Sequence, residues 1–202
     1  MVLTTPRPAC GRTLPRVVRE CLDAGATAIQ LRDKTATAGE LYDIALELLP
    51  ELNAFDALFL VNDRFDVALA AGAHGVHLGP EDLPVFEVRR VVPPGFLIGT
   101  STDDPAIGRQ AARDGADYLG IGAVFGTRSR PGLEHESIGP ERVREVLEAS
   151  GLPGVGIGGI TPENATSVFR VGAGIAVLSA VMNAADPGVV VREIRALMDE
   201  AG

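Results

Sequence analysis

The sequence has few of the residues on which several classes of protein depend. Only two of its 202 residues are cysteines, Cys10 and Cys21, and they form neither a disulfide framework nor the repeated spacing of a zinc site. The longest strongly apolar stretch, residues 171–182, is too short to span a bilayer. The N-terminus lacks the basic and apolar regions of a secretory signal. We therefore expect reduced thiols, no membrane segment and a cytoplasmic location.

Basic residues are also in deficit. Eighteen Lys and Arg stand against 27 Asp and Glu, which gives a formal net charge of −9. This balance argues against a general attraction to nucleic acid or to anionic membranes, so an anionic ligand must be held by a local cluster. Lysine occurs once, at position 34, beside 17 arginines. Because a compact ammonium and a planar guanidinium are not interchangeable, Lys34 is a candidate functional residue.

Short runs of Val, Ile and Leu alternate with longer amphipathic segments along the whole chain. This alternation is typical of parallel strands joined by helices. We predict strands at residues 2–5, 28–31, 58–62, 75–78, 97–100, 118–121, 155–158 and 175–178, with helices between them, among others at 38–49, 105–114, 140–149 and 187–201. The pattern indicates an α/β protein with one domain over residues 1–202.

A weak internal repeat narrows the architecture. Gly25, Gly72, Gly115 and Gly172 each precede an alanine and each end a predicted helix, where glycine can adopt the left-handed conformation. Their spacings of 47, 43 and 57 residues correspond to two strand–helix units each. Four similar quarters predict a compact (β/α)8 TIM barrel rather than an open sheet.

A barrel of this kind carries its functional residues at the carboxyl ends of its strands. Polar residues, together with Gly159 and Leu178, lie in the last residues of the predicted strands or in the loops that follow them. In chain order they are Gln30, Arg32 and Lys34; Asn62 and Asp63; Asp82; Ser101; Thr127, Ser129 and Arg130; Gly159; and Leu178 with Ser179. We expect them to share one mouth of the barrel.

The residues after strands two to four suggest a metal and a diphosphate. Asp63 and Asp82 would repel one another unless a cation lies between them, and Mg²⁺ suits two carboxylates combined with phosphate oxygens. Arg32 and Lys34 would face the same mouth and could balance a diphosphate. The alternative is that Asp63 pairs with Arg64 or caps the next helix, and that Asp82 caps the helix near residue 84.

Two further segments are predicted to contact the anionic substrate. Residues 156–161 place bare backbone amides before a helix and favour phosphate binding, although a tight turn alone would also explain the glycines. The long connection from Ala123 to Gly139 is expected to form a mobile lid over an anionic substrate. His74 and His135 are expected at the surface and in the lid. His77 has no carboxylate or serine partner at a recognisable spacing, so no histidine is expected to act as catalytic base.

Seven short motifs together resemble the thiamine-phosphate synthase family, which also includes a TenI-like branch. They are Gln30–Lys34, Val61–Arg64, Gly75–Gly79 with Glu81–Asp82, Gly99–Ser101, Gly122–Arg130, Gly156–Ile160 and Leu178–Ala180. The resemblance covers nearly the whole chain. It implies a (β/α)8 transferase that joins a hydroxymethylpyrimidine diphosphate to a thiazole phosphate and releases diphosphate.

The resemblance also implies roles for individual residues. Gln30, Arg32, Lys34, Asn62 and Ser101 would bind the pyrimidine diphosphate, Asp63 and Asp82 would bind Mg²⁺, and Thr127, Ser129, Gly159, Leu178 and Ser179 would bind the thiazole phosphate. Lys34, Ser101 and Arg130 would be catalytic, and Arg130 would also bind the diphosphate. The reaction would be dissociative and would need little general base. The expected partners are phosphorylated small molecules, with neither nucleic acid nor membrane, and a homo-oligomer is left open.

The sequence departs from the family pattern at Pro80, where glutamine is usual, and at Arg130, where lysine is usual. A TenI-like thiazole tautomerase remains an alternative, although that chemistry would want a histidine near Ala123 and would not need the two aspartates. A non-catalytic barrel that binds thiamine phosphate and regulates a partner is a second alternative. A sugar-phosphate isomerase or epimerase is less favoured, because no acid–base pair is visible at the strand ends.

Overall fold

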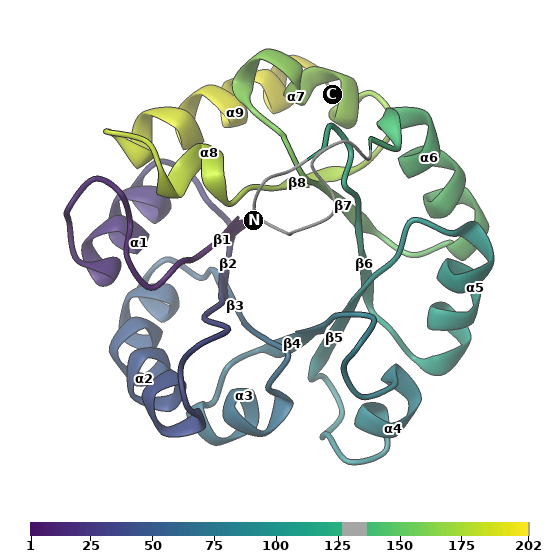
Figure 1. Cartoon of the computed structure of the whole chain (residues 1–202), viewed down its shortest axis with the longest axis horizontal. Coiled ribbons are helices and arrows are strands. Elements are labelled where there is room, and N and C mark those ends of the chain that lie inside the picture. The colour runs from purple at the N-terminus through teal and green to yellow at the C-terminus, as the bar shows by residue number, and fades with distance from the viewer. Residues whose placement is uncertain (127–136, 202) are drawn as a thin grey trace.

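The computed structural model describes residues 1–126 and 137–201, and these form a ring of parallel strands surrounded by helices (Figure 1). The strands follow the chain order around the ring, and each pairs with the next. They are β1 (Val2–Leu3), β2 (Ala28–Leu31), β3 (Leu58–Asn62), β4 (Gly75–Leu78), β5 (Leu97–Ser101), β6 (Tyr118–Ile121), β7 (Gly154–Ile157) and β8 (Gly174–Ala176). A hydrogen bond of 2.8 Å from Leu3 N to Val177 O closes the ring. The predicted (β/α)8 barrel is confirmed.

Helices cover the outer face of the ring. They are α1 (Leu14–Asp23), α2 (Ala38–Ala54), α3 (Phe65–Ala71), α4 (Val85–Arg89), α5 (Pro105–Asp114), α6 (Gly139–Ser150), α7 (Pro162–Phe169), α8 (Ser179–Met182) and α9 (Pro187–Ala201). In the described part of the chain, none is long and apolar enough to cross a membrane.

The helix ends follow the glycine repeat. Gly25, Gly72, Gly115 and Gly172 all have positive φ, between 73° and 95°, so the left-handed conformation expected of them is present. Two of them, Gly72 and Gly115, are the C-cap residues of α3 and α5. The repeat therefore marks where the chain leaves the outer layer and enters the barrel.

The predicted end of α2 at residue 49 is wrong. The helix continues through Pro50 to Ala54, although proline removes one hydrogen bond inside a helix. Its buried face continues past the proline, because Leu48 and Leu52 are both fully buried. Apolar burial therefore outweighs the local preference of Pro50 to end the helix.

Small shifts occur at four strands. β1 ends at Leu3 rather than Thr5, and β5 extends one residue further, to Ser101. β7 begins and ends one residue earlier than expected, and β8 begins one residue earlier and ends at Ala176. At β1 the side chain of Thr4 is used outside the sheet, because Thr4 Oγ1 accepts a hydrogen bond of 3.0 Å from Arg32 N. Thr4 N also donates a hydrogen bond of 3.0 Å to Gln30 O, so both the backbone and the side chain of Thr4 hold this edge of the barrel to β2 and the residues that follow it.

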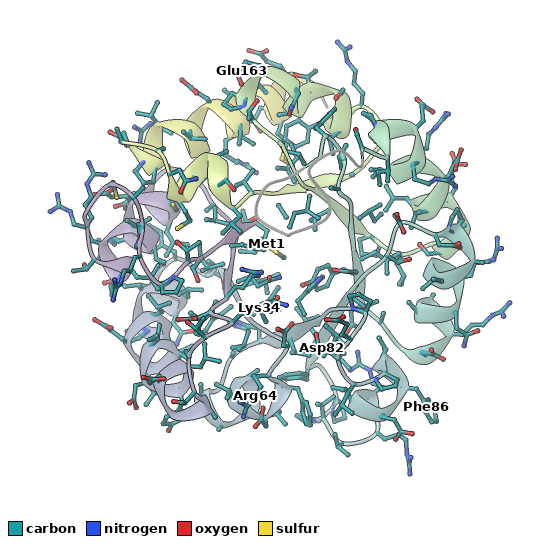
Figure 2. The ribbon with its side chains drawn as sticks, viewed as in Figure 1. Met1, Lys34, Arg64, Asp82, Phe86 and Glu163 are labelled. Carbon is teal, nitrogen blue, oxygen red and sulfur yellow. The ribbon has the colours of Figure 1, made fainter. Side chains whose placement is uncertain are left out.

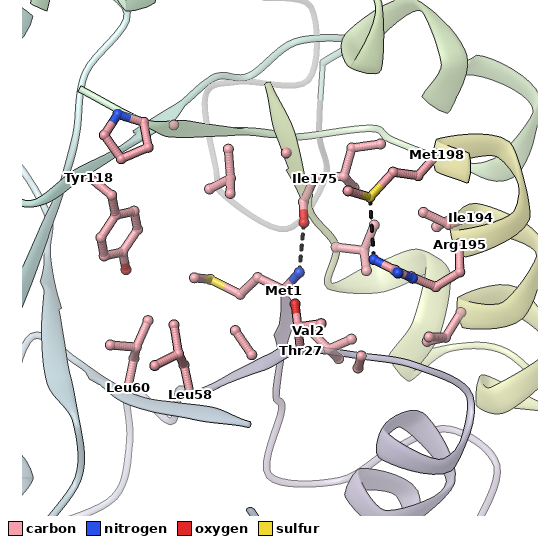
Figure 3. A pocket seen from close by; sticks show the side chains of 18 of the residues that line it. Met1, Val2, Thr27, Leu58, Leu60, Tyr118, Ile175, Ile194, Arg195 and Met198 are labelled. Carbon is pink, nitrogen blue, oxygen red and sulfur yellow. Dashed lines mark hydrogen bonds between the residues drawn. The ribbon is translucent and has the colours of Figure 1, made fainter. Parts of the chain in front are cut away.

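The two ends of the barrel differ. At the amino ends of the strands an apolar cavity of about 410 Å³ is lined by residues of several strands and of α9 (Figure 3). Leu58, Leu60 and Ile175 line it, and Met198 of α9 contributes to its wall. Those polar residues singled out from the sequence that the structure describes lie at the opposite end.

Candidate active site

Charged side chains from β2, β3 and β4 converge at the carboxyl end of the barrel. Lys34 Nζ lies 3.8 Å from Asp63 Oδ2. Lys34 and Asp82 point toward the centre of the ring in Figure 2, whereas Arg64 lies outside it, over α3. The two acidic residues and the single lysine therefore share one rim, as the sequence predicts.

Asp63 is held in an unusual backbone conformation. Its φ is +64°, in the left-handed region that few residues other than glycine, asparagine and aspartate adopt. Its amide donates a hydrogen bond of 2.8 Å to His77 O on the neighbouring strand. The turn after β3 is therefore tied to β4 at the point where the carboxylate is presented.

The two carboxylates influence one another. Burial, together with the hydrogen bond and negative charge of Asp82, raises the pKa of Asp63 to about 6, although Lys34 and Arg32 act in the opposite direction. Asp82 Oδ2 accepts a hydrogen bond of 2.6 Å from Gly79 N. Negative charge is therefore concentrated at this rim, and a cation would relieve it.

The alternative explanations for these aspartates do not hold. Arg64 pairs with Asp66, through a hydrogen bond of 2.8 Å from Nε to Oδ1, rather than with Asp63. The N-cap residue of α4 is Pro84, and Asp82 bonds back to Gly79 instead of capping that helix. Neither carboxylate is used by the nearest helix.

A histidine and a serine meet inside the barrel, which the sequence reasoning missed. His77 Nε2 lies 2.8 Å from Ser101 Oγ, and His77 Nδ1 lies 2.9 Å from Tyr118 Oη. Burial lowers the pKa of His77 to about 4, so the ring is neutral at pH 7. The expectation that His77 has no serine partner is therefore wrong, because the partner comes from the next strand, β5.

The strand register contained the missing signal. His77 pairs with Gly99, which pairs in turn with Tyr118, and Ser101 follows Gly99 by two residues on the same face of β5. The glycine at position 99 leaves room for its larger neighbours. This register depends on how three strands are aligned and could not be read from the spacing of residues within one segment.

Gln30 and Asn62 lie on neighbouring strands at the same end of the interior. Gln30 is only 2% exposed, and its Oε1 is buried without a hydrogen-bond partner in the described structure. Asn62, at the end of β3, is half-buried. A buried acceptor without a partner is costly, so Gln30 is suited to receive a donor from a ligand.

A second set of residues lies across the ring, after β7 and β8 (Figure 1). Gly158 and Gly159 both have positive φ, of 100° and 63°. Their carbonyl oxygens accept hydrogen bonds from Phe125 N at 3.1 Å and Asn164 Nδ2 at 2.9 Å. A Cβ at Gly159 would lie 2.3 Å from Gly126 O, so this loop requires glycine.

The two remaining residues expected at this wall are adjacent in the chain. Leu178 is half-buried and is the N-cap residue of α8, and Ser179 begins that helix and is exposed. The described structure therefore brings two groups of predicted residues to the same end of the barrel. One group follows β2 to β5 and the other follows β7 and β8.

Several predicted residues lie outside the described part of the chain, namely Thr127, Ser129, Arg130 and His135. The two ends of the predicted lid are bound to the barrel. Ile138 N and Gly139 N donate to Ala123 O and Val124 O, both at 3.0 Å, and Ser137 Oγ donates to Val124 O at 2.6 Å. These ends therefore belong to the frame of the barrel.

The donor set is small for a metal held by protein alone. Within residues 1–126 and 137–201, no group of three or more His, Cys, Asp or Glu side chains is arranged to hold a metal ion. Mg²⁺ nevertheless needs only one or two carboxylates when phosphate oxygens and water complete its shell. The mutual repulsion of Asp63 and Asp82 fits such a shared cation.

Comparisons with known proteins agree with this geometry. The family model for thiamine monophosphate synthase matches residues 1–181. The thiamine-phosphate synthase of Haloquadratum walsbyi is 41% identical over 202 aligned residues, covering 99% of this chain and 91% of that protein. The corresponding enzyme of Pyrococcus abyssi is 45% identical over 184 residues, covering 91% of this chain and 87% of that protein.

The same relationship is found among solved structures. The thiamine phosphate pyrophosphorylase from Pyrococcus furiosus superposes with a TM-score of 0.89 at 42% sequence identity, and the match covers 99% of this chain and 95% of that chain. The chain therefore belongs to the thiamine monophosphate synthase family.

Proposed function

We propose that this rim carries out the thiamine-phosphate synthase reaction, a transferase reaction, by holding a departing diphosphate between Mg²⁺ and Lys34. A hydroxymethylpyrimidine diphosphate would be joined to a thiazole phosphate, with release of diphosphate. The observation that supports this most strongly is the position of Asp63, beside Asp82 and 3.8 Å from Lys34. Carboxylates alone would repel a diphosphate, so the pair requires a cation to be useful.

Asp63 and Asp82 would hold Mg²⁺, and its chemistry when bound would be to neutralise charge on the leaving diphosphate. Lys34 and Arg32 would supply further positive charge to the same oxygens. Lys34 is exposed and can follow the diphosphate as it departs, whereas Arg32 is half-buried and tethered through its amide to Thr4.

The pyrimidine would lie over the interior of the barrel. Gln30 Oε1 would accept a hydrogen bond from its amino group and so lose the cost of an unpaired buried acceptor. Ser101 and Asn62 would contact the same half of the substrate. Rupture of the bond to diphosphate would leave a resonance-stabilised methylene cation, which the thiazole nitrogen then attacks.

This order of events asks little of a general base. The leaving group departs with its electron pair, and the thiazole nitrogen attacks with its own lone pair, so no proton must be removed to start the reaction. Electrostatic stabilisation and exclusion of water carry the catalysis. The low pKa of His77 agrees with this, because a ring with a pKa of about 4 is a poor base.

The thiazole phosphate would bind at the opposite wall. Gly159, Leu178 and Ser179 lie there, and the carbonyl oxygens of Gly158 and Gly159 are already hydrogen-bonded, which favours presenting amides to the phosphate. Thr127, Ser129 and Arg130 complete this proposal from the resemblance, with Arg130 serving the diphosphate as a catalytic cation. The two substrates would then meet above the centre of the ring.

A thiazole tautomerase is the second candidate. That reaction needs an acid–base side chain near position 123, but Ala123 carries only a methyl group and is buried. Asp63 and Asp82 would have no role in the tautomerase reaction. The synthase is therefore the better match to these residues.

A direct assay separates the two reactions. Purified protein with Mg²⁺ and both phosphorylated substrates should release diphosphate and form thiamine phosphate in equal amounts, and addition of EDTA should stop both. The same protein should leave the thiazole tautomer alone unchanged. Tautomer conversion without diphosphate release would contradict the proposal.

A further inference from the structure

A row of hydrogen-bonded side chains crosses the barrel behind the rim. Tyr118 of β6, His77 of β4 and Ser101 of β5 are joined by contacts of 2.9 Å and 2.8 Å, with His77 in the middle. None of the reaction steps proposed above uses Tyr118 or His77. Only Ser101 is expected to touch a substrate.

Two glycines make this row fit. A Cβ at Gly99 would lie 2.1 Å from Tyr118 Cζ, and a Cβ at Gly120 would lie 2.9 Å from His77 Cε1. Distances below 3 Å to the atoms of packed rings require those rings to move. The interior faces of β5 and β6 therefore leave space at these glycines, and the two rings fill it.

The protons in the row can be assigned from its partners. The Tyr118 hydroxyl contacts His77 Nδ1 at 2.9 Å, whereas the amide nitrogen of Gln30 donates to Met1 Sδ at 3.8 Å and Gln30 Oε1 has no partner among the described residues. The phenol therefore directs its proton to His77 Nδ1, the acceptor with which it is in hydrogen-bond contact. A neutral imidazole has one N–H, which must then be at Nε2 and face Ser101 Oγ.

We propose that Tyr118 and His77 are positioning residues that fix the direction of the Ser101 hydroxyl. His77 Nε2–H donates to Ser101 Oγ, so the proton of Ser101 is turned away from the histidine and toward the substrate. Ser101 then acts as a hydrogen-bond donor of fixed direction. The identity of that substrate, the pyrimidine diphosphate, rests on the proposed function.

If the row acts through Ser101, the effect of replacing Tyr118 on substrate binding should depend on the presence of the Ser101 hydroxyl. Tyr118→Phe removes the hydroxyl and keeps the ring, so His77 loses the partner that selects its tautomer. We expect the KM for the pyrimidine diphosphate to rise about tenfold, with the KM for the thiazole phosphate unchanged. In a Ser101→Ala background the same change should have no further effect on that KM. Tyr42→Phe, the other tyrosine of the chain, is the matched control.

Replacements of His77 provide an independent check. The amide nitrogen of glutamine matches Nε2 of histidine and can still donate to Ser101, whereas the shorter asparagine matches Nδ1 and reaches only toward Tyr118. We expect His77→Gln to bind the pyrimidine diphosphate nearly as well as the wild-type protein and His77→Asn to bind it about tenfold more weakly. A purely structural role would make the two variants equal.

Nitrogen-15 NMR of the His77 ring tests the assignment without any substrate. We expect a protonated Nε2 and an unprotonated Nδ1 in the wild-type protein, and a mixture of tautomers in Tyr118→Phe. A protonated Nδ1 in the wild-type protein, or additive effects of Tyr118→Phe and Ser101→Ala, would overturn the inference. Failure to form thiamine phosphate at all would instead overturn the proposed function, and the NMR result would still decide this one.

Discussion

The two ends of this barrel are built from the same strands but have opposite chemistry. β3 places Leu58 and Leu60 beside the apolar cavity and ends at Asn62, directly before Asp63 at the charged rim. β5 runs from Leu97, which lines the cavity, to Ser101, which meets His77. Within four or five residues the environment changes from apolar to polar, and at β3 to charged.

This difference separates stability from chemistry. At the amino ends, side chains contribute by being removed from water, so their replacement should change the free energy of unfolding. At the carboxyl ends, polar groups are held close together at some cost, as the raised pKa of Asp63 indicates. We therefore expect substitutions at the two ends to affect different measurements.

The largest effect is expected at the charged rim. Lys34→Ala or Asp63→Asn should lower kcat by on the order of 10²–10³-fold, because charge on the leaving diphosphate is no longer balanced. Asparagine is preferred to alanine at position 63 because it tolerates the positive φ. Diphosphate release measures kcat, and circular dichroism checks that the barrel remains folded.

Asp66→Asn is the matched control for this change. It removes the same kind of charge from α3, where Asp66 is exposed and pairs with Arg64. An exposed pair contributes little, so kcat should stay within about twofold of the wild-type value. Equal losses in Asp63→Asn and Asp66→Asn would show that general charge, rather than the rim, matters.

The opposite end should respond in stability alone. Leu60 is 1% exposed, so Leu60→Ala should lower the free energy of unfolding by about 2–4 kcal/mol. Leu58 borders the same cavity but is 43% exposed, so Leu58→Ala should cost less than about 1 kcal/mol. Urea denaturation measures both. The comparison between the two ends fails if either variant loses kcat while remaining folded.

A smaller effect is expected in the dependence of stability on pH. The pKa of His77 is about 4 in the folded protein against an ordinary value of 6.5, so the unfolded chain binds the proton first as the pH falls. This residue therefore removes stability as the pH falls from about 6.5 to about 4. His77→Gln should remove this contribution to the pH dependence of the free energy of unfolding.

Asp63 acts with the opposite sign in nearly the same interval. Its pKa is about 6 when folded against an ordinary 3.8, so the folded protein binds the proton first and gains stability as the pH falls from about 6 to about 4. Asp63→Asn should not gain stability in this way as the pH falls. Thermal unfolding of both variants across pH 4–7 separates the two contributions, and slopes that match the wild-type slope would contradict both assignments.

Most of the fold could be predicted from the sequence because its signals are local. The strands β2, β3, β4 and β6 have the predicted bounds, and the glycines before the alanines end helices or the turns that follow them. The error at Pro50 arose because the burial of Leu52 depends on the helix packing against the barrel. That contact is not visible in the local preference of proline.

The grouping of charged residues at the rim can be predicted from the sequence with a single rule. The carboxyl ends of parallel strands meet at the same end of the barrel, so Lys34, Asp63 and Asp82 are expected together. The bond between His77 and Ser101 is not, because it depends on the register of β4 against β5 and on the space left at Gly99. Contacts between residues on different strands can be predicted only when the register of those strands is known.

The central claim is that Asp63 and Asp82 hold Mg²⁺ against a diphosphate that also contacts Lys34. A crystal structure of the protein with Mg²⁺ and the pyrimidine diphosphate tests this most directly. We predict the metal between the two carboxylates, the diphosphate on the metal and Lys34, and the pyrimidine amino group on Gln30 Oε1. A diphosphate bound away from these residues, or a metal that touches neither aspartate, would contradict the account.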